Sequence, residues 1–334
     1  MLPLRRRALL GAPLLGACAA APTIVRAAEA STAPWPSRPV RLIVGYPPGS
    51  PTDLCARVLA EDMRTRVGQP VLVENRPGAN GSLGAAFVAA AEPDGHTLLL
   101  SNTSTMTVNH LLYRDIRYDP LRDLLPVASL TLSPFFLTAS PKSPRSRAFR
   151  DVAGLVAAAK ADPGSLVYGS AGNGNLQHLY MEQWAGSLGL RLLHAPFRGA
   201  APAENALVAG DIDLMLETAA STPLLRSAAL IPLATTGATR WRDLPAVPTL
   251  AEAGFPGFTA TFWNGLVAPA GLPAPLLDRL AGLVEAAAAS PVTRPLLLAQ
   301  GDVMVLGPAA FRERIAADIA RHAALIRATG IELQ

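Results

Sequence analysis

Two kinds of apolar segment alternate along most of this chain. Short aliphatic and β-branched runs predict buried strands, and apolar residues three or four positions apart predict helices. The clearest pair is a strand over 38–45 and a helix over 53–67, in which Leu54 and Val58 share a face and Gly68 ends the helix. The same patterns predict strands over 69–74, 97–100, 130–139, 165–168, 192–195, 212–216, 231–234 and 261–268, and helices over 82–91, 149–160, 176–189, 203–209, 274–300 and 311–328. This alternation indicates an α/β fold with a parallel sheet and right-handed crossovers.

A loop rich in Pro and Gly joins the first strand to the first helix. It has the sequence Tyr46-Pro-Pro-Gly-Ser-Pro-Thr-Asp53, and we expect Thr52 or Asp53 to be the N-cap. A helix N-terminus presents unpaired backbone N–H groups at the positive end of its dipole, which suits a carboxylate or phosphate. The alternative is an ordinary strand–helix turn that binds nothing.

Hydroxyl residues follow the predicted strand over 97–100, in the segment Ser101-Asn-Thr-Ser-Thr105. Ligands of open α/β sheets bind at the carboxyl ends of strands, so this segment and the first loop are expected to face the same site. A second Gly-rich loop, Ser170 to Asn175, precedes another helix later in the chain. Two strand–helix series then suggest two lobes around a cleft, lobe 1 over 36–137 plus 236–334 and lobe 2 over 138–235.

Residues 1–28 have the pattern of an export signal. Arg5-Arg-Arg7 precedes a short apolar run and then small residues up to Ala28. The consecutive arginines favour the twin-arginine route to the periplasm, and the run is too short to span a bilayer. A lipoprotein cleavage box at Leu15-Gly-Ala-Cys18 is the alternative. Export would leave Cys55 as the only thiol, which we expect to be a packing residue.

Motifs for catalysis, metals, cofactors and nucleic acids are absent from the sequence. It has no Gly-x-Ser-x-Gly elbow, no P-loop and no His-Glu-x-x-His, and Gly172-Asn-Gly174 lacks the third Gly of a dinucleotide fingerprint. The five histidines lack metal-ligand spacing, and the net charge of +4 is scattered. Asp53 and Glu217 are the acidic residues nearest the expected cleft, but two distant carboxylates do not make an acid–base pair. We therefore expect a protein that is not an enzyme, with no cofactor, metal or nucleic acid.

Several sequence blocks from Trp35 onward resemble one family, the Bug-type extracytoplasmic solute receptors of tripartite tricarboxylate transporters. The blocks are Pro48-Gly-Ser-Pro-Thr-Asp53, Val73-Glu-Asn-Arg-Pro-Gly-Ala79, Pro93-Asp-Gly-His-Thr97, Tyr168-Gly-Ser-Ala-Gly-Asn-Gly174, His194-Ala-Pro-Phe-Arg-Gly199, Leu244-Pro-Ala-Val-Pro-Thr249 and Trp263-Asn-Gly265. The resemblance implies a two-lobed periplasmic binding protein, type II-like, that closes like a Venus flytrap on a small carboxylate-bearing ligand. It also implies membrane permease subunits as partners, and we expect a monomer. A receptor of the same fold that serves a signalling partner is the alternative.

The resemblance, together with the two loops, nominates the residues that bind the ligand. In lobe 1 they are Tyr46, Pro48, Gly49, Ser50, Thr52, Asp53, Ser101 and Thr103; in lobe 2 they are Ser170, Gly172, Asn173, Gly174, Asn175, His178, Phe197 and Glu217. Four of them depart from the family pattern. Ser50 stands where Gly is usual, Asn175 where Ser or Thr is usual, Phe197 where Tyr is frequent, and Glu217 where some relatives carry Asp. Glu217 either meets a ligand ammonium or caps a helix.

Overall fold

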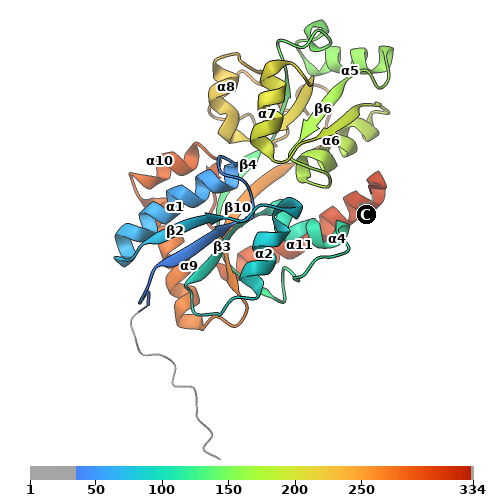
Figure 1. Cartoon of the computed structure of the whole chain (residues 1–334). Coiled ribbons are helices and arrows are strands. Elements are labelled where there is room, and N and C mark those ends of the chain that lie inside the picture. The colour runs from blue at the N-terminus through green and yellow to red at the C-terminus, as the bar shows by residue number, and fades with distance from the viewer. Residues whose placement is uncertain (1–34, 332–334) are drawn as a thin grey trace, which may run out of the picture. The chain divides into compact units, whose positions relative to one another are not determined.

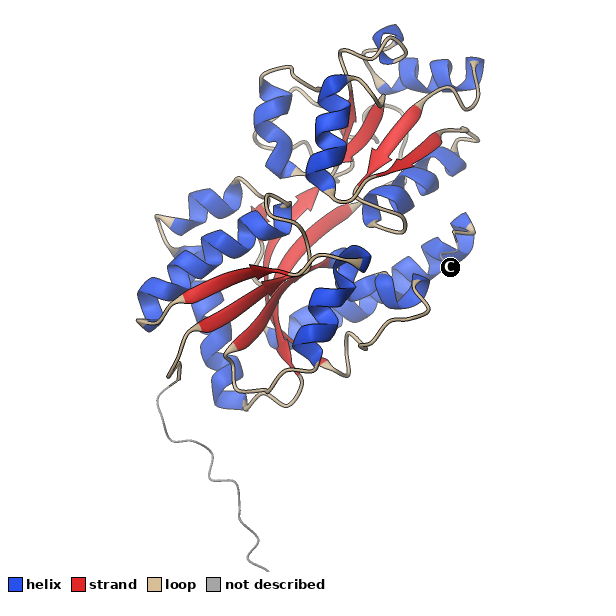
Figure 2. Ribbon diagram, viewed as in Figure 1, coloured by secondary structure: helices blue, strands red, loops and turns tan. Residues whose placement is uncertain are grey.

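Two β-sheets organise the part of the chain that the computed structural model describes, residues 35–331 (Figures 1 and 2). These residues lie within one compact unit. The predicted export signal over 1–28 lies outside the described residues. No helix among residues 35–331 is long and apolar enough to cross a membrane.

The first sheet, sheet A, has six strands in the order β11-β4-β10-β3-β1-β2. They are β1 Val40–Val44, β2 Val71–Asn75, β3 Thr97–Asn102, β4 Leu124–Pro134, β10 Thr261–Pro269 and β11 Asp302–Val303. β1 is parallel to β2 and β3, whereas β10 is antiparallel to β3 and β4, and β11 is antiparallel to β4. The expected parallel sheet is therefore parallel at β1, β2 and β3 and mixed as a whole. The chain leaves sheet A at the end of β4 and returns to it at the start of β10, where Pro134 lies opposite Thr261. Because the chain leaves and returns at the same place, the two strands run in opposite directions.

The second sheet, sheet B, has five strands in the order β7-β6-β8-β5-β9. They are β5 Phe136–Ala139, β6 Val167–Ser170, β7 Leu193–Pro196, β8 Leu214–Glu217 and β9 Ile231–Thr235. β6 is parallel to β7 and β8, while β5 is antiparallel to β8 and β9. The reason is the same, because β5 enters sheet B where β9 leaves it, with Phe136 opposite Thr235.

The predicted single strand over 130–139 is in fact two strands that belong to different sheets. β4 ends at Pro134 and β5 begins at Phe136, so Phe135 is the link between the sheets. Its amide donates to Thr236 Oγ1 at 2.9 Å, and its carbonyl accepts from the Thr236 amide at 2.8 Å. The outgoing and returning crossings are thus bonded to each other. A continuous apolar pattern in the sequence cannot reveal such a change of sheet.

Helices cover both faces of each sheet (Figure 2). They are α1 Pro51–Val67, α2 Ser82–Ala89, α3 Thr103–Thr107, α4 Asn109–Leu112, α5 Val152–Ala161, α6 Leu176–Ser187, α7 Ala200–Ala209, α8 Thr222–Arg226, α9 Ala274–Ala289, α10 Thr293–Leu298 and α11 Pro308–Thr329, with single 3-10 turns at Ala79–Gly81, Ser146–Ala148 and Ala219–Ser221. The predicted helix over 274–300 is interrupted after Ala289. Pro291 follows there, and the residue before a proline is restricted to extended backbone.

Alternate residues of each central strand enter different hydrophobic clusters. Leu42 of β1 packs with Leu59 and Met63 of α1, whereas Ile43 packs on the other face with Val88 of α2 and Ile315 of α11. Strands buried on both faces have continuous rather than alternating apolar sequence, which is why they were predicted from short apolar runs. Cys55 is fully buried in the first of these clusters, which confirms its packing role.

Gly265 in β10 has no room for a side chain. A Cβ there would lie 2.4 Å from the Phe311 ring and 3.0 Å from the Ala128 carbonyl oxygen. We predict that Gly265→Ala lowers the free energy of unfolding by roughly 1–3 kcal/mol through overpacking. The matched control is Gly282→Ala in α9, where nothing lies within 4 Å and the same methyl group should stabilise by about 0.5–1 kcal/mol. Urea denaturation of both variants measures this, and equal effects at the two sites would contradict the packing argument.

Candidate functional site

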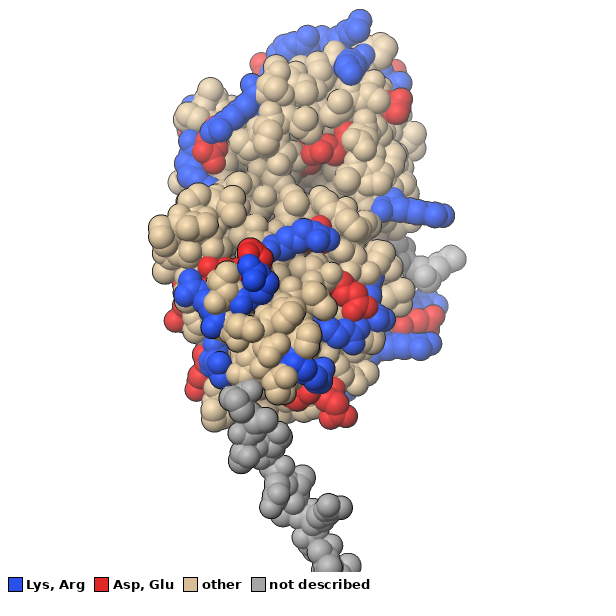
Figure 3. Space-filling model, turned by 60° about the vertical axis from the view of Figure 1, so that its left-hand side comes forward, with Lys and Arg blue, Asp and Glu red and all other residues tan. Residues whose placement is uncertain are grey.

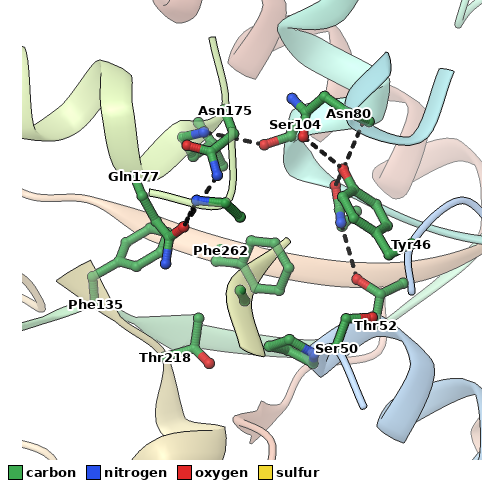
Figure 4. A pocket seen from close by; sticks show the side chains of 15 residues that line it. Tyr46, Ser50, Thr52, Asn80, Ser104, Phe135, Asn175, Gln177, Thr218 and Phe262 are labelled. Atoms are coloured by element: carbon green, nitrogen blue, oxygen red, sulfur yellow. Dashed lines mark hydrogen bonds between the residues drawn. The ribbon is translucent and has the colours of Figure 1, made fainter. Parts of the chain in front are cut away.

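A cavity lies between the two sheets and is lined by segments from both (Figure 4). The space in it that is open to a water-sized molecule is about 50 Å³, so its walls leave room for a few waters. Its lining comprises Tyr46, Ser50, Pro51, Thr52, Asn80, Asn102, Ser104 and Phe262 from the side of sheet A, Ala171, Asn175, Leu176, Gln177, Ala200 and Thr218 from the side of sheet B, and Phe135 from the link between the sheets. None of these side chains is charged.

The loop after β1 positions the first wall of the cavity. Ser50, rather than Thr52 or Asp53, is the N-cap of α1, and its hydroxyl accepts a hydrogen bond from the Asp53 amide at 3.2 Å. Pro51 takes the first helical position, where a missing N–H costs nothing. Gly49 turns the chain with a φ of 81°, and its amide donates to Asp53 Oδ2 at 2.9 Å. Among the loop's amides, that of Thr52 has no hydrogen-bond partner within the described residues.

Asp53 holds this loop in place and is itself almost completely buried. Its carboxylate accepts from the Gly49 amide, from Arg57 Nε at 2.9 Å and from Asn75 Nδ2 at 2.8 Å. Burial raises the pKa of Asp53, but the hydrogen bonds from Arg57, Asn75 and Gly49 outweigh it and hold the pKa below its usual value. The carboxylate therefore stays ionised, and it is fully engaged in linking the loop to β2.

Three hydroxyl groups of the cavity already accept a hydrogen bond from the protein. Ser50 Oγ accepts from the Asp53 amide, Thr52 Oγ1 from Asn102 Nδ2 at 2.9 Å, and Ser104 Oγ from the Leu176 amide at 3.2 Å. Within residues 35–331 none of these hydroxyls has an acceptor for its own proton. Their remaining capacity is to donate, which is what an anionic ligand requires. Thr218, which follows β8, adds a fourth hydroxyl without a bond to any described residue (Figure 4).

Tyr46 also lines this wall and forms hydrogen bonds that hold its neighbours in place. Its hydroxyl lies 2.9 Å from the Asn80 carbonyl oxygen, 3.0 Å from Thr105 Oγ1 and 3.2 Å from Asn102 Oδ1. Burial raises the pKa of Tyr46 to about 12, so it remains a neutral donor at physiological pH. Asn102 in turn orients Thr52, so Tyr46 acts on the cavity through this chain of hydrogen bonds.

The second wall is the N-terminus of α6. Asn175 caps the helix by accepting from the His178 amide at 3.0 Å. The Gln177 side chain donates to the Leu216 carbonyl at 2.7 Å and accepts from the Ala171 amide at 2.8 Å, which ties α6 to β8 and to the Gly-rich loop. The Leu176 amide reaches across to Ser104, so one hydrogen bond joins the two walls.

A second cavity adjoins the first and holds the acidic residues of the site. The space in it that is open to water-sized molecules is about 130 Å³, and it shares Pro51, Gln177, Ala200 and Thr218 with the first cavity. Glu217 at the end of β8 and Glu204 of α7 both line it. Their carboxyl groups meet at one hydroxyl, because Ser221 Oγ lies 2.7 Å from Glu217 Oε2 and 2.6 Å from Glu204 Oε2.

This arrangement requires a proton on one of the two carboxyl groups. A hydroxyl has a single proton, so Ser221 donates to one carboxylate and accepts from the other, which must then be protonated. Burial, and then the charge of Glu204, raise the pKa of Glu217 to about 8, against a smaller opposing effect of Ser221. Glu217 is therefore the neutral partner at pH 7.

Most of the other nominated residues lie away from the first cavity. Ser101 is buried beside it, and Thr103 accepts from the Trp263 amide at 2.8 Å; Ser104, one position further, lines the cavity instead. Ser170 is held by His194 Nε2 at 2.7 Å. Pro48 and Asn173 are exposed, Gly49 lines only the second cavity, and Gly172 and Phe197 line a different cavity beside Tyr46.

His178 has a structural position rather than one in the cavity. Its ring stacks on that of His194 with centroids 3.9 Å apart, and its Nδ1 accepts from the Gly174 amide at 3.0 Å. Burial lowers the pKa of His178, so the ring is a neutral acceptor that fixes the Gly-rich loop. Among residues 35–331, no group of three or more His, Cys, Asp or Glu side chains is placed to hold a metal ion.

Comparison with known proteins identifies the family. The family model described as the tripartite tricarboxylate transporter family receptor matches residues 55–331. The chain belongs to this receptor family. It is 35% identical to protein BugT of Bordetella pertussis over 311 residues, which cover 92% of this chain and 94% of BugT.

Solved structures of similar proteins agree with this assignment. One is Rpa4515 of R. palustris with adipate, with a TM-score of 0.84 and 31% identity, covering 89% of this chain and 99% of that one. Another is MatC from Rhodopseudomonas palustris with bound malate, with a TM-score of 0.80 and 31% identity, covering 87% and 100%. The predicted Bug-type resemblance and the α/β fold of a two-lobed periplasmic binding protein are thereby confirmed.

Several lining residues of this receptor were not nominated from the sequence. Ser104 and Thr218 both follow strands of the two sheets, so the rule that ligands bind at the carboxyl ends of strands would have found them. Gln177 stands where a dinucleotide fingerprint would have its third Gly, and no other sequence signal marks it. Phe135 is the link between the sheets and Phe262 lies at the start of β10; their ring centroids are 6.1 Å apart, and no sequence signal marks either residue.

The raised pKa of Glu217 predicts a stability that falls with pH. Between the unfolded pKa near 4.5 and the folded pKa of about 8, the folded state keeps a proton that the unfolded state has released, so stability is lost as pH rises through this window. Glu217→Gln removes the loss. From pH 5 to pH 8, we predict that the variant gains on the order of 2–4 kcal/mol in the free energy of unfolding relative to the parent.

Urea denaturation of the ligand-free protein at pH 5, 6.5 and 8 tests this. The control is Glu285→Gln, which makes the same change at an exposed position of α9. If parent and Glu217→Gln curves stay parallel across the three pH values, Glu217 does not carry the proton.

Proposed function

We propose that this protein is a periplasmic solute-binding receptor that captures a small carboxylate-bearing ligand between its two sheets. It would deliver the ligand to the membrane subunits of a tripartite tricarboxylate-type transporter, and it would catalyse no reaction. The observation that carries the proposal is the set of hydroxyl groups at Ser50, Thr52 and Ser104, whose accepting sides are occupied by protein N–H groups. Family membership and the adipate and malate in related structures support the ligand class.

The carboxylate would lie at the N-terminus of α1. The free Thr52 amide and the Thr52 hydroxyl both belong to the first turn of this helix, where the dipole favours negative charge. Ser104 would close the site from α3. Because no Lys or Arg lines either cavity, the anion would be held by neutral donors alone. Hydrogen bonds from neutral groups to a charged ligand contribute roughly 1.5–3 kcal/mol each.

Lobe 1 would correspond to sheet A with its helices and lobe 2 to sheet B with its helices, joined at Phe135 and Thr236. Figure 3 shows Lys, Arg, Asp and Glu mixed over one face of the molecule, without a continuous basic patch on that face. This distribution supports a small-molecule ligand over a nucleic acid. The export signal over 1–28 and the periplasmic location remain part of the proposal.

A thermal-shift screen with mono-, di- and tricarboxylates and amino acids tests the function directly. A ligand at one hundred times its dissociation constant stabilises the folded state by about 2.7 kcal/mol, which raises the melting temperature by several degrees. We expect at least one compound that carries a carboxylate to do so, and the corresponding amide or alcohol to have no effect. Absence of a shift with every carboxylate would overturn the proposal.

Thr52→Val tests the place of the carboxylate. The change removes the donating hydroxyl but keeps the shape of the side chain, so we predict that affinity for the carboxylate found in the screen falls about tenfold to a hundredfold. Thr65→Val is the matched control, since Thr65 is exposed in the same helix and donates to the Asp62 carbonyl. Calorimetry measures both variants, and unchanged affinity in folded Thr52→Val would place the carboxylate elsewhere.

A further inference from the structure

The Glu217 carboxyl group is buried beside the site with one oxygen unused. Glu217 is 3% exposed, and its Oε1 has no hydrogen-bond partner among the described residues. Oε2 is occupied by Ser221. A buried polar atom without a partner costs free energy, so such an atom in the wall of a cavity indicates a group that the ligand supplies.

The hydrogen bonds and charges around Glu217 Oε1 determine which ligand group can lie beside it. If Oε2 holds the proton that Ser221 accepts, Oε1 is a carbonyl oxygen and only accepts; if Glu217 is ionised, Oε1 also only accepts. Glu204 completes the pair and keeps at least one negative charge on it. No Lys or Arg lines either cavity, so this charge has no cationic partner in the walls.

We propose that the ligand of this receptor carries a protonated amine in addition to its carboxylate, and that the amine donates to Glu217 Oε1 in the field of Glu204. This deepens the proposed function and rests on it. The two cavities share Pro51, Gln177, Ala200 and Thr218 and so adjoin each other, and the ligand would extend from the carboxylate site at Thr52 to the acidic pair. A dicarboxylate in the same position would bring its second carboxylate against the acidic pair, with the N-terminal dipole of α7 but no Lys or Arg to offset the repulsion.

The N-terminus of α7 faces the second cavity as well, because Ala200 and Ala201 line it and Gly199 provides no side-chain cap. Its dipole favours an anion close to the amine position. α-Amino acids, in which a carboxylate and an ammonium are separated by one carbon, therefore belong in the test together with amino acids of longer spacing.

The experiment is calorimetry of the mature protein with matched probes. The amino probes are the ω-amino acids from 3-aminopropanoate to 6-aminohexanoate and the common α-amino acids. Each is compared with three counterparts in which the ammonium is replaced by a hydroxyl, a methyl or a carboxylate group. We expect at least one amino probe to bind at least tenfold more tightly than all three counterparts.

Two variants test whether the preference for the amine comes from Glu217 and Glu204. Glu217→Met removes the acceptor at similar length and should abolish the preference for the amine, while binding of the methyl counterpart persists and shows that the fold is intact. Glu204→Gln removes the charge from a half-buried position and should reduce the preference and improve binding of the dicarboxylate. Glu285→Gln, an exposed change of the same charge, should leave all affinities as in the parent.

Three outcomes count against the inference. Tighter binding of a dicarboxylate or hydroxy acid than of every amino counterpart would overturn it and leave the proposed receptor function standing. An amine preference that survives both Glu217→Met and Glu204→Gln would also overturn the assignment to this acidic pair. Failure of every carboxylate to bind would instead overturn the proposed function, and the inference with it.

Discussion

The geometry of the site depends on one pair of hydrogen bonds between the two crossings. Phe135 and Thr236 exchange amide and carbonyl or hydroxyl contacts at the point where β4 passes into sheet B and the chain after β9 turns back. Thr236 Oγ1 also donates to the Ala260 carbonyl at 2.7 Å, so the segment that leads into β10 is tied to the same point. This junction joins the two sheets at the wall of the cavity, and the Leu176–Ser104 and Tyr180–His322 hydrogen bonds join the two sides elsewhere.

An uncharged cavity can still bind an anion when its donors are oriented in advance. In this receptor the orientation comes from filling the accepting side of each hydroxyl with a protein N–H group, as at Ser50 and Ser104. The hydroxyl proton is then directed away from that bond and toward the cavity, so little rotational freedom is lost when the ligand arrives. Neutral donors also carry a smaller desolvation penalty than a buried Lys or Arg would.

Because Glu217 and Glu204 meet at Ser221, one end of the site is rich in acceptors and the other end is rich in donors. Donors gather around the N-terminus of α1, and acceptors gather at Glu217 and Glu204, with the apolar rings of Phe135 and Phe262 in the first cavity. A ligand with an anionic and a cationic end matches this polarity in one orientation only. The related structures with adipate and malate share this fold, so the amine preference that we propose would come from the residues around the second cavity rather than from the architecture.

The sequence by itself determined the α/β class, the positions of most helices and strands, the loops at strand ends and the family. These features are local, because apolar periodicity and turn residues act over a few neighbouring positions, as at Gly49. It also nominated Tyr46, Ser50, Thr52 and Asn175, which line the first cavity, and Glu217, which lines the second.

Tertiary structure alone decided which side chains meet. Phe135 divides an unbroken apolar run between two sheets, and this division makes both sheets mixed. Ser104 rather than Ser101 or Thr103 lines the cavity, where it meets Leu176, a residue 72 positions further along the chain. Ser221 joins Glu204 to Glu217 only because α7 packs beside β8 and the turn that follows it. Such contacts depend on the direction in which each side chain leaves its element and on pairings between distant segments, and neither is encoded in a local pattern.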